Sequence, residues 1–195
     1  MEQKNFWNDA AKYGAVIGLL LALSMLFETY AVLSGSTALI GLMVPEFIVV
    51  VVLHYVLLHR YTKRYGASFP VEEGFPYSKA YSYILLLSAF AGVIVGAVQA
   101  VYLHVVIGYA AYMEQYVAAI QNYLSQSGNV SASMEPMLAQ LFDTLESAEA
   151  PSFLQTVWSS LFSSLLFGAF FGLIIAGVLS RAPKLFDDQT TDGEN

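Results

Sequence analysis

The chain has 195 residues, of which 57% are hydrophobic and 12% are charged. The charged share is about half of the roughly 25% found in soluble domains, and the mean hydropathy is +0.59. A soluble fold of this length cannot bury so much apolar surface, so the composition indicates a membrane protein. The lack of cysteine excludes thiol catalysis, Cys-ligated zinc and iron–sulfur clusters, and the net charge of -7 argues against nucleic-acid binding.

Four apolar stretches are long enough to cross a bilayer, which takes about 20 helical residues. They cover residues 13–33, 38–58, 84–107 and 153–179. Runs of this length without strict alternation predict helices rather than barrel strands, so we expect an all-α integral membrane protein built on a four-transmembrane-helix bundle. Residues 1–186 then form a single membrane domain, and the polar residues 187–195 a disordered acidic tail. The first stretch exceeds the ~7–15 apolar residues of a signal peptide, so we expect it to remain as a span.

The basic residues predict the orientation of the spans. Cytoplasmic loops are enriched in Lys and Arg, and here the outer segments 34–37 and 108–152 contain neither. We therefore expect a multi-pass membrane protein with both termini in the cytoplasm. The eight basic residues lie in the N-terminal segment, the loop between spans two and three, and the C-terminal tail: Lys4, Lys12, Arg60, Lys63, Arg64, Lys79, Arg181 and Lys184.

Residues 109–148 predict an extracytoplasmic amphipathic helical hairpin between spans three and four. Apolar side chains recur there at spacings of three and four, and Ser127-Gly128-Asn129 predicts the turn between the two helices. The two apolar stripes either cover each other and the end of the bundle or form a groove for a protein partner. Binding flat on the outer leaflet is disfavoured, because the segment has no Lys or Arg to contact anionic lipid. The candidate partner surface comprises Tyr116, Ile120, Tyr123, Leu138, Leu141 and Phe142.

Small residues recur at every fourth position in spans one, three and four. Residues four apart share one face of a helix, and small side chains there let two backbones approach closely. One interpretation is packing within the bundle; the other is a homo-oligomer through span four, where the stripe is longest. The candidate packing residues are Gly14, Gly18, Gly92, Gly96, Gly168 and Gly172.

Two acidic residues, Glu28 in span one and Glu46 in span two, lie in the outer half of the predicted bundle. His104 lies at a similar level in span three, and Gln99 lies deeper. Acidic groups inside a membrane are costly and often functional, so one hypothesis is a proton or cation site formed by these four residues. The other is structural: if span two begins at Pro45, Glu46 lies in its first turn and complements the helix dipole.

The sequence provides no support for catalysis, a cofactor or a metal. It has no HExxH, GxSxG or P-loop motif. His54 and His59 are five residues apart, about 140° around a helix, which is a poor spacing for a metal pair. We therefore expect a protein that is not an enzyme.

Several short segments are familiar. They are Phe6-Trp7-Asn8 leading into Lys12-Tyr13-Gly14-Ala15-Val16-Ile17-Gly18, then Phe75-Pro76-Tyr77-Ser78-Lys79-Ala80-Tyr81 with Ala91-Gly92-Val93-Ile94, and finally Ile174 to Arg181. With these segments the chain resembles domain-of-unknown-function family 4199. The resemblance implies a small four-span bacterial membrane protein and supplies no activity and no catalytic residues.

These observations favour a non-enzymatic membrane component that binds an unidentified protein partner or scaffolds an assembly through its outer hairpin. The alternative is a small oligomeric proton- or cation-coupled transporter that uses Glu28 and Glu46. The two hypotheses differ in which substitutions should matter, those on the hairpin surface or those of the acidic residues.

Overall fold

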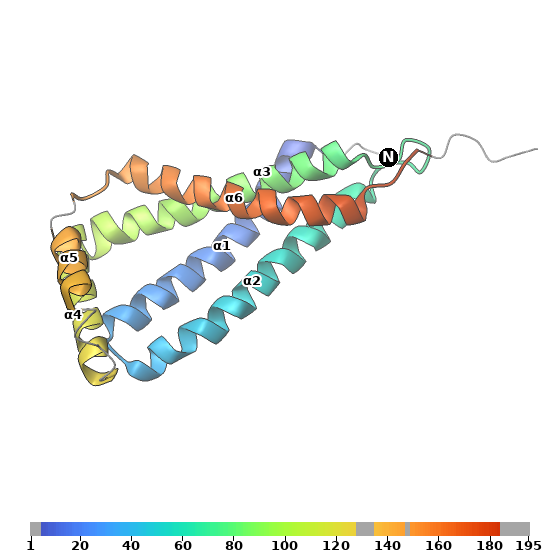
Figure 1. Ribbon diagram of the computed structural model, residues 1–195. Coiled ribbons are helices and arrows are strands. Elements are labelled where there is room, and N and C mark those ends of the chain that lie inside the picture. Colours follow the sequence, from blue (N-terminus) through green and yellow to red (C-terminus); the bar gives the residue numbers. More distant parts are fainter. Residues whose placement is uncertain (1–4, 128–134, 147–148, 184–195) are drawn as a thin grey trace, which may run out of the picture.

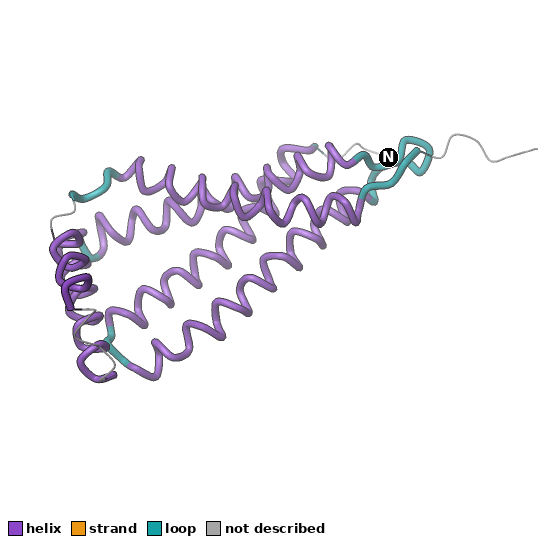
Figure 2. Tube along the Cα trace, in the orientation of Figure 1, coloured by secondary structure: helices purple, strands orange, loops and turns teal. Residues whose placement is uncertain are grey.

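The structure is a computed structural model and describes residues 5–127, 135–146 and 149–183. Within these ranges the secondary structure is helical, without any β-strand (Figure 2). The elements are α1 (Phe6–Leu33), α2 (Thr37–Gly66), α3 (Tyr77–Val101), the short π-helix η1 (Tyr102–Val106), α4 (Tyr109–Ser127), α5 (Glu135–Glu146) and α6 (Phe153–Leu179).

Four helices are long and apolar enough to cross a membrane: α1, α2, α3 together with η1, and α6. The prediction of an all-helical chain with four spans is therefore confirmed, and the four helices indicate a multi-pass membrane protein. The predicted span 153–179 coincides with α6. This helix begins after Ser152, which forms a capping box: its hydroxyl accepts a hydrogen bond from the Gln155 N–H.

Three helices extend beyond the predicted apolar spans at one end of the bundle. α1 begins at Phe6 instead of 13, α2 continues to Gly66 instead of 58, and α3 begins at Tyr77 instead of 84. Apolar length measures only what crosses the bilayer, whereas a helix continues wherever one face stays packed. The last turns of α2 show this, because Thr62 and Tyr65 are buried while Lys63 and Arg64 are exposed.

α3 is the central helix of the bundle. It packs most extensively against α6, then against α1, whereas α2 contacts mainly α1 (Figure 1). All six predicted packing glycines lie at helix contacts within the chain: Gly14 and Gly18 of α1 against α3, Gly92 and Gly96 of α3 against α6, and Gly168 and Gly172 of α6 against α3.

The small-residue face of α6 is thus occupied by α3 of the same chain. A homo-oligomer through span four stays a prediction. It would have to use the opposite face of α6, where Phe162, Leu166 and Phe170 are exposed.

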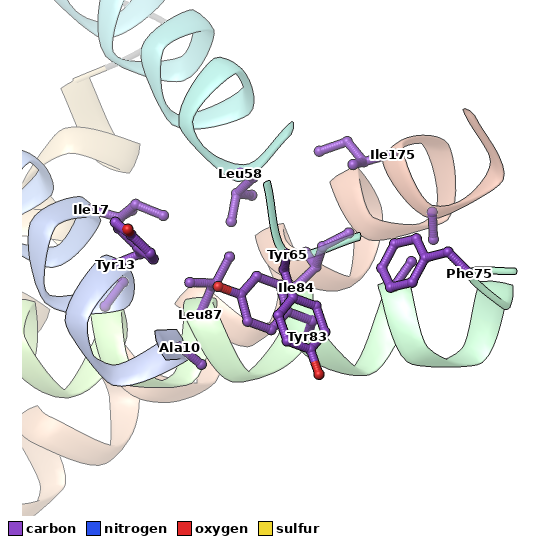
Figure 3. Close-up of a cluster of buried hydrophobic side chains, with 13 residues drawn as sticks. Ala10, Tyr13, Ile17, Leu58, Tyr65, Phe75, Tyr83, Ile84, Leu87 and Ile175 are labelled. Carbon is purple, nitrogen blue, oxygen red and sulfur yellow. The ribbon is translucent and has the colours of Figure 1, made fainter. Parts of the chain in front are cut away.

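The buried core lies toward the end of the bundle where the N-terminus and the α2–α3 loop are found (Figures 1 and 3). The rings of Tyr65 and Tyr83 stack there with centroids 4.2 Å apart, and the Tyr83 hydroxyl donates to Asp9 at 2.7 Å. Phe75, from the α2–α3 loop, packs edge-on against Tyr65. Tyr83 buries its ring and bonds its hydroxyl, and together with Tyr65 it therefore connects α1, α2 and α3 at this end.

Arg181 lies just after α6 and connects the segment that follows α6 to the end of α2 and to the α2–α3 loop. Its backbone exchanges two hydrogen bonds of 2.9 Å with Phe75, and its guanidinium donates to the carbonyls of Gly66 and Phe69 at 3.1 and 2.7 Å. Gly74 has a φ of +66°, and a Cβ there would lie 2.6 Å from the Arg181 carbonyl oxygen. This position therefore requires glycine for both its conformation and its space.

α4 and α5 lie across the opposite end of the bundle, near the turn between α1 and α2 (Figure 1). α4 contacts α1 and α5, and Gly108, with a φ of +81°, separates η1 from α4. The predicted hairpin turn and the tail 187–195 lie outside the described residues. All the described Lys and Arg side chains belong to the end away from α4 and α5, which we call the basic end.

We predict that Gly92→Ala destabilises the bundle, because the new Cβ would lie 2.8 Å from the Leu161 Cα, a backbone atom that cannot rotate away. Overpacking of this kind costs about 1–3 kcal/mol, which should lower the thermal midpoint in detergent. Gly177→Ala is the matched control, because a Cβ there meets nothing within 4 Å. Equal midpoints for the two variants would contradict the close α3–α6 contact.

Candidate functional site

α1 and α2 form a tight antiparallel hairpin that brings their acidic residues together. Gly35 has a φ of +62° and makes the turn between the helices. Ser24 and Glu46 lie equally many residues away from this turn. Ser24 is counted back from Leu33 at the end of α1, and Glu46 is counted forward from Thr37 at the start of α2. Because both helices rise by about 1.5 Å per residue, Ser24 and Glu46 face each other at the same depth.

Glu46 is held by a direct hydrogen bond from α1. The Ser24 hydroxyl donates to Glu46 Oε1 at 2.7 Å. The other oxygen, Oε2, is buried and receives no hydrogen bond from a conventional donor in the described part of the chain. A buried carboxyl oxygen without a donor costs about 1–3 kcal/mol or more, so Glu46 lacks one partner for its ionised form.

Glu28 can supply the partner that Glu46 Oε2 lacks, provided that one of the two carboxyl groups is protonated. Its carboxyl group lies within hydrogen-bonding reach of the Glu46 side chain. An ionised carboxyl group can only accept hydrogen bonds, so a bond between these two groups needs one proton. A shared proton would therefore complete the hydrogen bonding of these two half-buried acidic residues.

The structure excludes one of the structural interpretations of Glu46. α2 begins at Thr37 and continues through Pro45 without a break, so Glu46 is not in its first turn. The helix dipole acts within the first turn, hence the expected dipole role for Glu46 is wrong. Pro45 is exposed, and the helix tolerates it at this position.

Gln99 and His104 do not join the acidic pair through any contact in the described chain. Gln99 accepts a hydrogen bond of 2.8 Å from the Ser160 hydroxyl, which links α3 to α6. His104 lies in η1, its ring 6.1 Å from that of Phe153 at the start of α6, and its Nε2 is buried without a partner among the described residues. Of the four predicted residues, the structure thus brings together Glu28 and Glu46.

The described residues hold no group of three or more His, Asp or Glu side chains arranged for a metal ion. His54 and His59 point to different neighbours, as their spacing indicated. His54 lies edge-on to Phe171 with ring centroids 5.8 Å apart, whereas His59 stacks on Tyr55.

Sequence reasoning missed Ser24, because a serine in an apolar span resembles an ordinary packing residue. The signal that reveals it is its distance from the turn, which matches that of Glu46 on the other helix.

The residues of the predicted partner surface differ in their exposure. Tyr116 and Ile120 of α4, and Leu138 and Phe142 of α5, are half-buried, whereas Leu141 is 46% exposed. The side chain of Tyr123 lies outside the described residues. Tyr112 stacks on Tyr116 at 5.8 Å, and burial, followed by the neighbouring Tyr116, raises the pKa of Tyr112.

The comparisons with known proteins place the chain in a family. A family model described as "Protein of unknown function (DUF4199)" matches residues 12–181, which is most of the chain. The chain belongs to the DUF4199 family. No curated protein and no solved structure matches it significantly. The resemblance to this family is therefore confirmed, and because DUF4199 is a family of unknown function, the role of the protein has to be inferred from its own residues.

We predict that a hydrophobic carbodiimide modifies Glu28 or Glu46 at neutral pH. Carbodiimides react with protonated carboxyl groups in apolar surroundings, which the Glu28–Glu46 pair provides when its two carboxyl groups share a proton. Peptide mass spectrometry of protein labelled in bilayers measures the site. Glu72 and Glu114, which are exposed, are internal controls and should stay unmodified. Labelling of all four residues to the same extent would show that the pair is ionised like surface carboxyl groups.

Proposed function

We propose that this DUF4199 protein is a small proton- or cation-coupled transporter of a bacterial inner membrane, and not an enzyme. The close approach of the carboxyl groups of Glu28 and Glu46, with Glu46 Oε2 buried and without a hydrogen-bond partner among the described residues, carries the proposal. Two acidic residues in an apolar helical hairpin are expensive to keep, and they form a site that gains or loses one proton. Binding of a proton or cation at such a site is the step that couples transport to a gradient.

The position of the pair agrees with access from one side. Glu28 is about five residues from the outer end of α1, a depth of roughly 8 Å. The basic residues gather at the opposite end, which the positive-inside rule assigns to the cytoplasm. Both termini are then cytoplasmic, and the pair exchanges protons with the outer aqueous phase.

We predict that proteoliposomes of the wild-type protein dissipate an imposed pH gradient faster than protein-free vesicles. Glu28→Gln and Glu46→Gln should each reduce this flux to the level of protein-free vesicles, because glutamine keeps the shape and hydrogen bonds but does not carry the proton. An internal pH-sensitive dye measures the flux under gradients of both directions.

Glu114→Gln is the matched control, because Glu114 is exposed on α4 and lies outside the four spans. Its flux should equal that of the wild type. Full flux in both Glu28→Gln and Glu46→Gln would refute the carboxyl pair as the coupling site.

A second candidate function, binding of a protein partner through the α4–α5 hairpin, is favoured by a different observation. On α5, Met137 is 62% exposed and Leu141 is 46% exposed, although α5 is not among the four spans. Exposed apolar side chains beyond the membrane-spanning helices favour contact with another protein. In this case the protein is a scaffolding component and the carboxyl pair only stabilises the α1–α2 hairpin.

For this second function we predict that a photo-crosslinking residue at position 141 captures a protein partner in native membranes. The same residue at Asp143, which is exposed on the same helix, should capture much less. Leu141→Glu should abolish the association, whereas Glu28→Gln should leave it unchanged. Crosslinks from position 141 to lipid alone would exclude the hairpin surface as a protein-binding site.

A further inference from the structure

α2 carries two more polar atoms that are sealed inside the bundle. His54 is 5% exposed and Thr62 is fully buried. His54 Nε2 and Thr62 Oγ1 have no hydrogen-bond partner among the described residues. Buried polar atoms are nearly always paired with protein or with ordered water, and each unpaired one costs about 1–3 kcal/mol. Two such atoms on one helix therefore call for an explanation.

These residues continue from the acidic pair along one row of α2. Glu46, Val50, His54, Leu58 and Thr62 follow each other at intervals of four, and such rows form the ridges by which helices pack. Val50 is half-buried, and the next three members of the row, His54, Leu58 and Thr62, are buried. The polar members of the row are about 12 Å apart along the axis, too far for direct hydrogen bonds.

The row ends at the polar groups of the basic end. Tyr65 lies one turn beyond Thr62 and stacks on Tyr83, whose hydroxyl donates to Asp9. Asp9 is half-buried at the start of α1. The row therefore runs from one acidic site in the outer half of the bundle to another carboxyl group at the opposite end.

α2 is the least closely packed of the four spans. α2 contacts α3 and α6 far less extensively than α3 contacts α1 and α6. Ordered water needs polar partners, and His54 Nε2 and Thr62 Oγ1 provide them at successive depths. An imidazole both accepts and donates a proton, so His54 is suited to pass a proton between two waters without a net change in its own charge.

We propose that His54 and Thr62 line a proton path, completed by water, that connects the Glu28–Glu46 pair with the basic end of the bundle. The path rests on the proposed function, because it supplies the second aqueous access that a proton-coupled site needs. A proton entering at one end is balanced by one leaving at the other, and His54 is a positioning and relay residue between them.

The test compares His54→Phe and Thr62→Val with the wild type in the proteoliposome flux assay. Phenylalanine is close in size to histidine and removes the unpaired nitrogen, so the variant should fold with an unchanged or higher thermal midpoint. His54→Phe should reduce the flux to that of protein-free vesicles, and Thr62→Val should reduce it partially. His59→Phe is the matched control on the same helix, because His59 is only half-buried and stacks on Tyr55, and its flux should equal that of the wild type.

The outcomes separate this inference from the function on which it rests. Loss of flux in Glu46→Gln with full flux in His54→Phe overturns the path and leaves the transporter intact. Absence of flux in the wild type refutes a proton-coupled function, and a second measurement then decides about the path. In solid-state NMR of ¹⁵N-histidine-labelled protein in bilayers, the His54 Nε2 signal, assigned with His54→Phe, should show contact with water protons. A dry His54 overturns the path whatever the flux.

Discussion

Close contact between the backbone of α3 and those of α1 and α6 is the constraint on which the rest of the structure depends. Lipid chains are as apolar as the helices, so helices associate in a membrane through packing and hydrogen bonds. Gly14 and Gly92 allow this packing, because a Cβ at either position would lie less than 3 Å from a backbone atom of the neighbouring helix. α1, α3 and α6 thereby form a closely packed unit, and α2 is attached to it by fewer contacts.

The consequence for α2 differs between its two halves. Toward the basic end, Leu58 and Tyr65 enter the common core, and Arg181 bonds the carbonyl at the end of the helix. In the half away from the basic end the apolar side chains are largely exposed, as suits contact with lipid. The hydrogen bond from Ser24 and the contact with Glu28 therefore attach this half of α2 to α1 by polar groups.

Two local sequence patterns, the length of the apolar stretches and the spacing of the glycines, predicted much of the fold, because each depends on a single physical requirement. The length of the apolar stretches predicted four spans. The span 153–179 coincides with α6 because a capping box at Ser152 fixes where this helix begins. The glycine spacing predicted faces of close approach, and the structure fills them from within the chain. α1, α2 and α3 extend beyond the predicted apolar spans, because one face of each helix stays packed in the aromatic core at the basic end.

The candidate site was harder to predict, because depth in the membrane does not determine which helices are neighbours. Glu28 and Glu46 meet since a tight turn fixes their helices side by side, and the turn is visible in the sequence. His104 lies at a similar expected level, but η1 places its ring beside Phe153. No sequence pattern predicted this π-helical turn. Ser24, His54 and Thr62 are polar residues within apolar spans, and only the packing shows that their polar atoms are turned inward.

Because few contacts attach α2, the strength of its contact with α1 depends on the charge of the acidic pair. With one proton, Glu28 and Glu46 share a hydrogen bond that joins α1 to the outer half of α2. Without it, two like charges face each other in surroundings of low dielectric constant, where their repulsion is stronger than in water. Loss of the proton therefore weakens the contact between the two helices where few other contacts replace it. A contact between two helices that depends on one proton is the property that the proposed coupled transport would use.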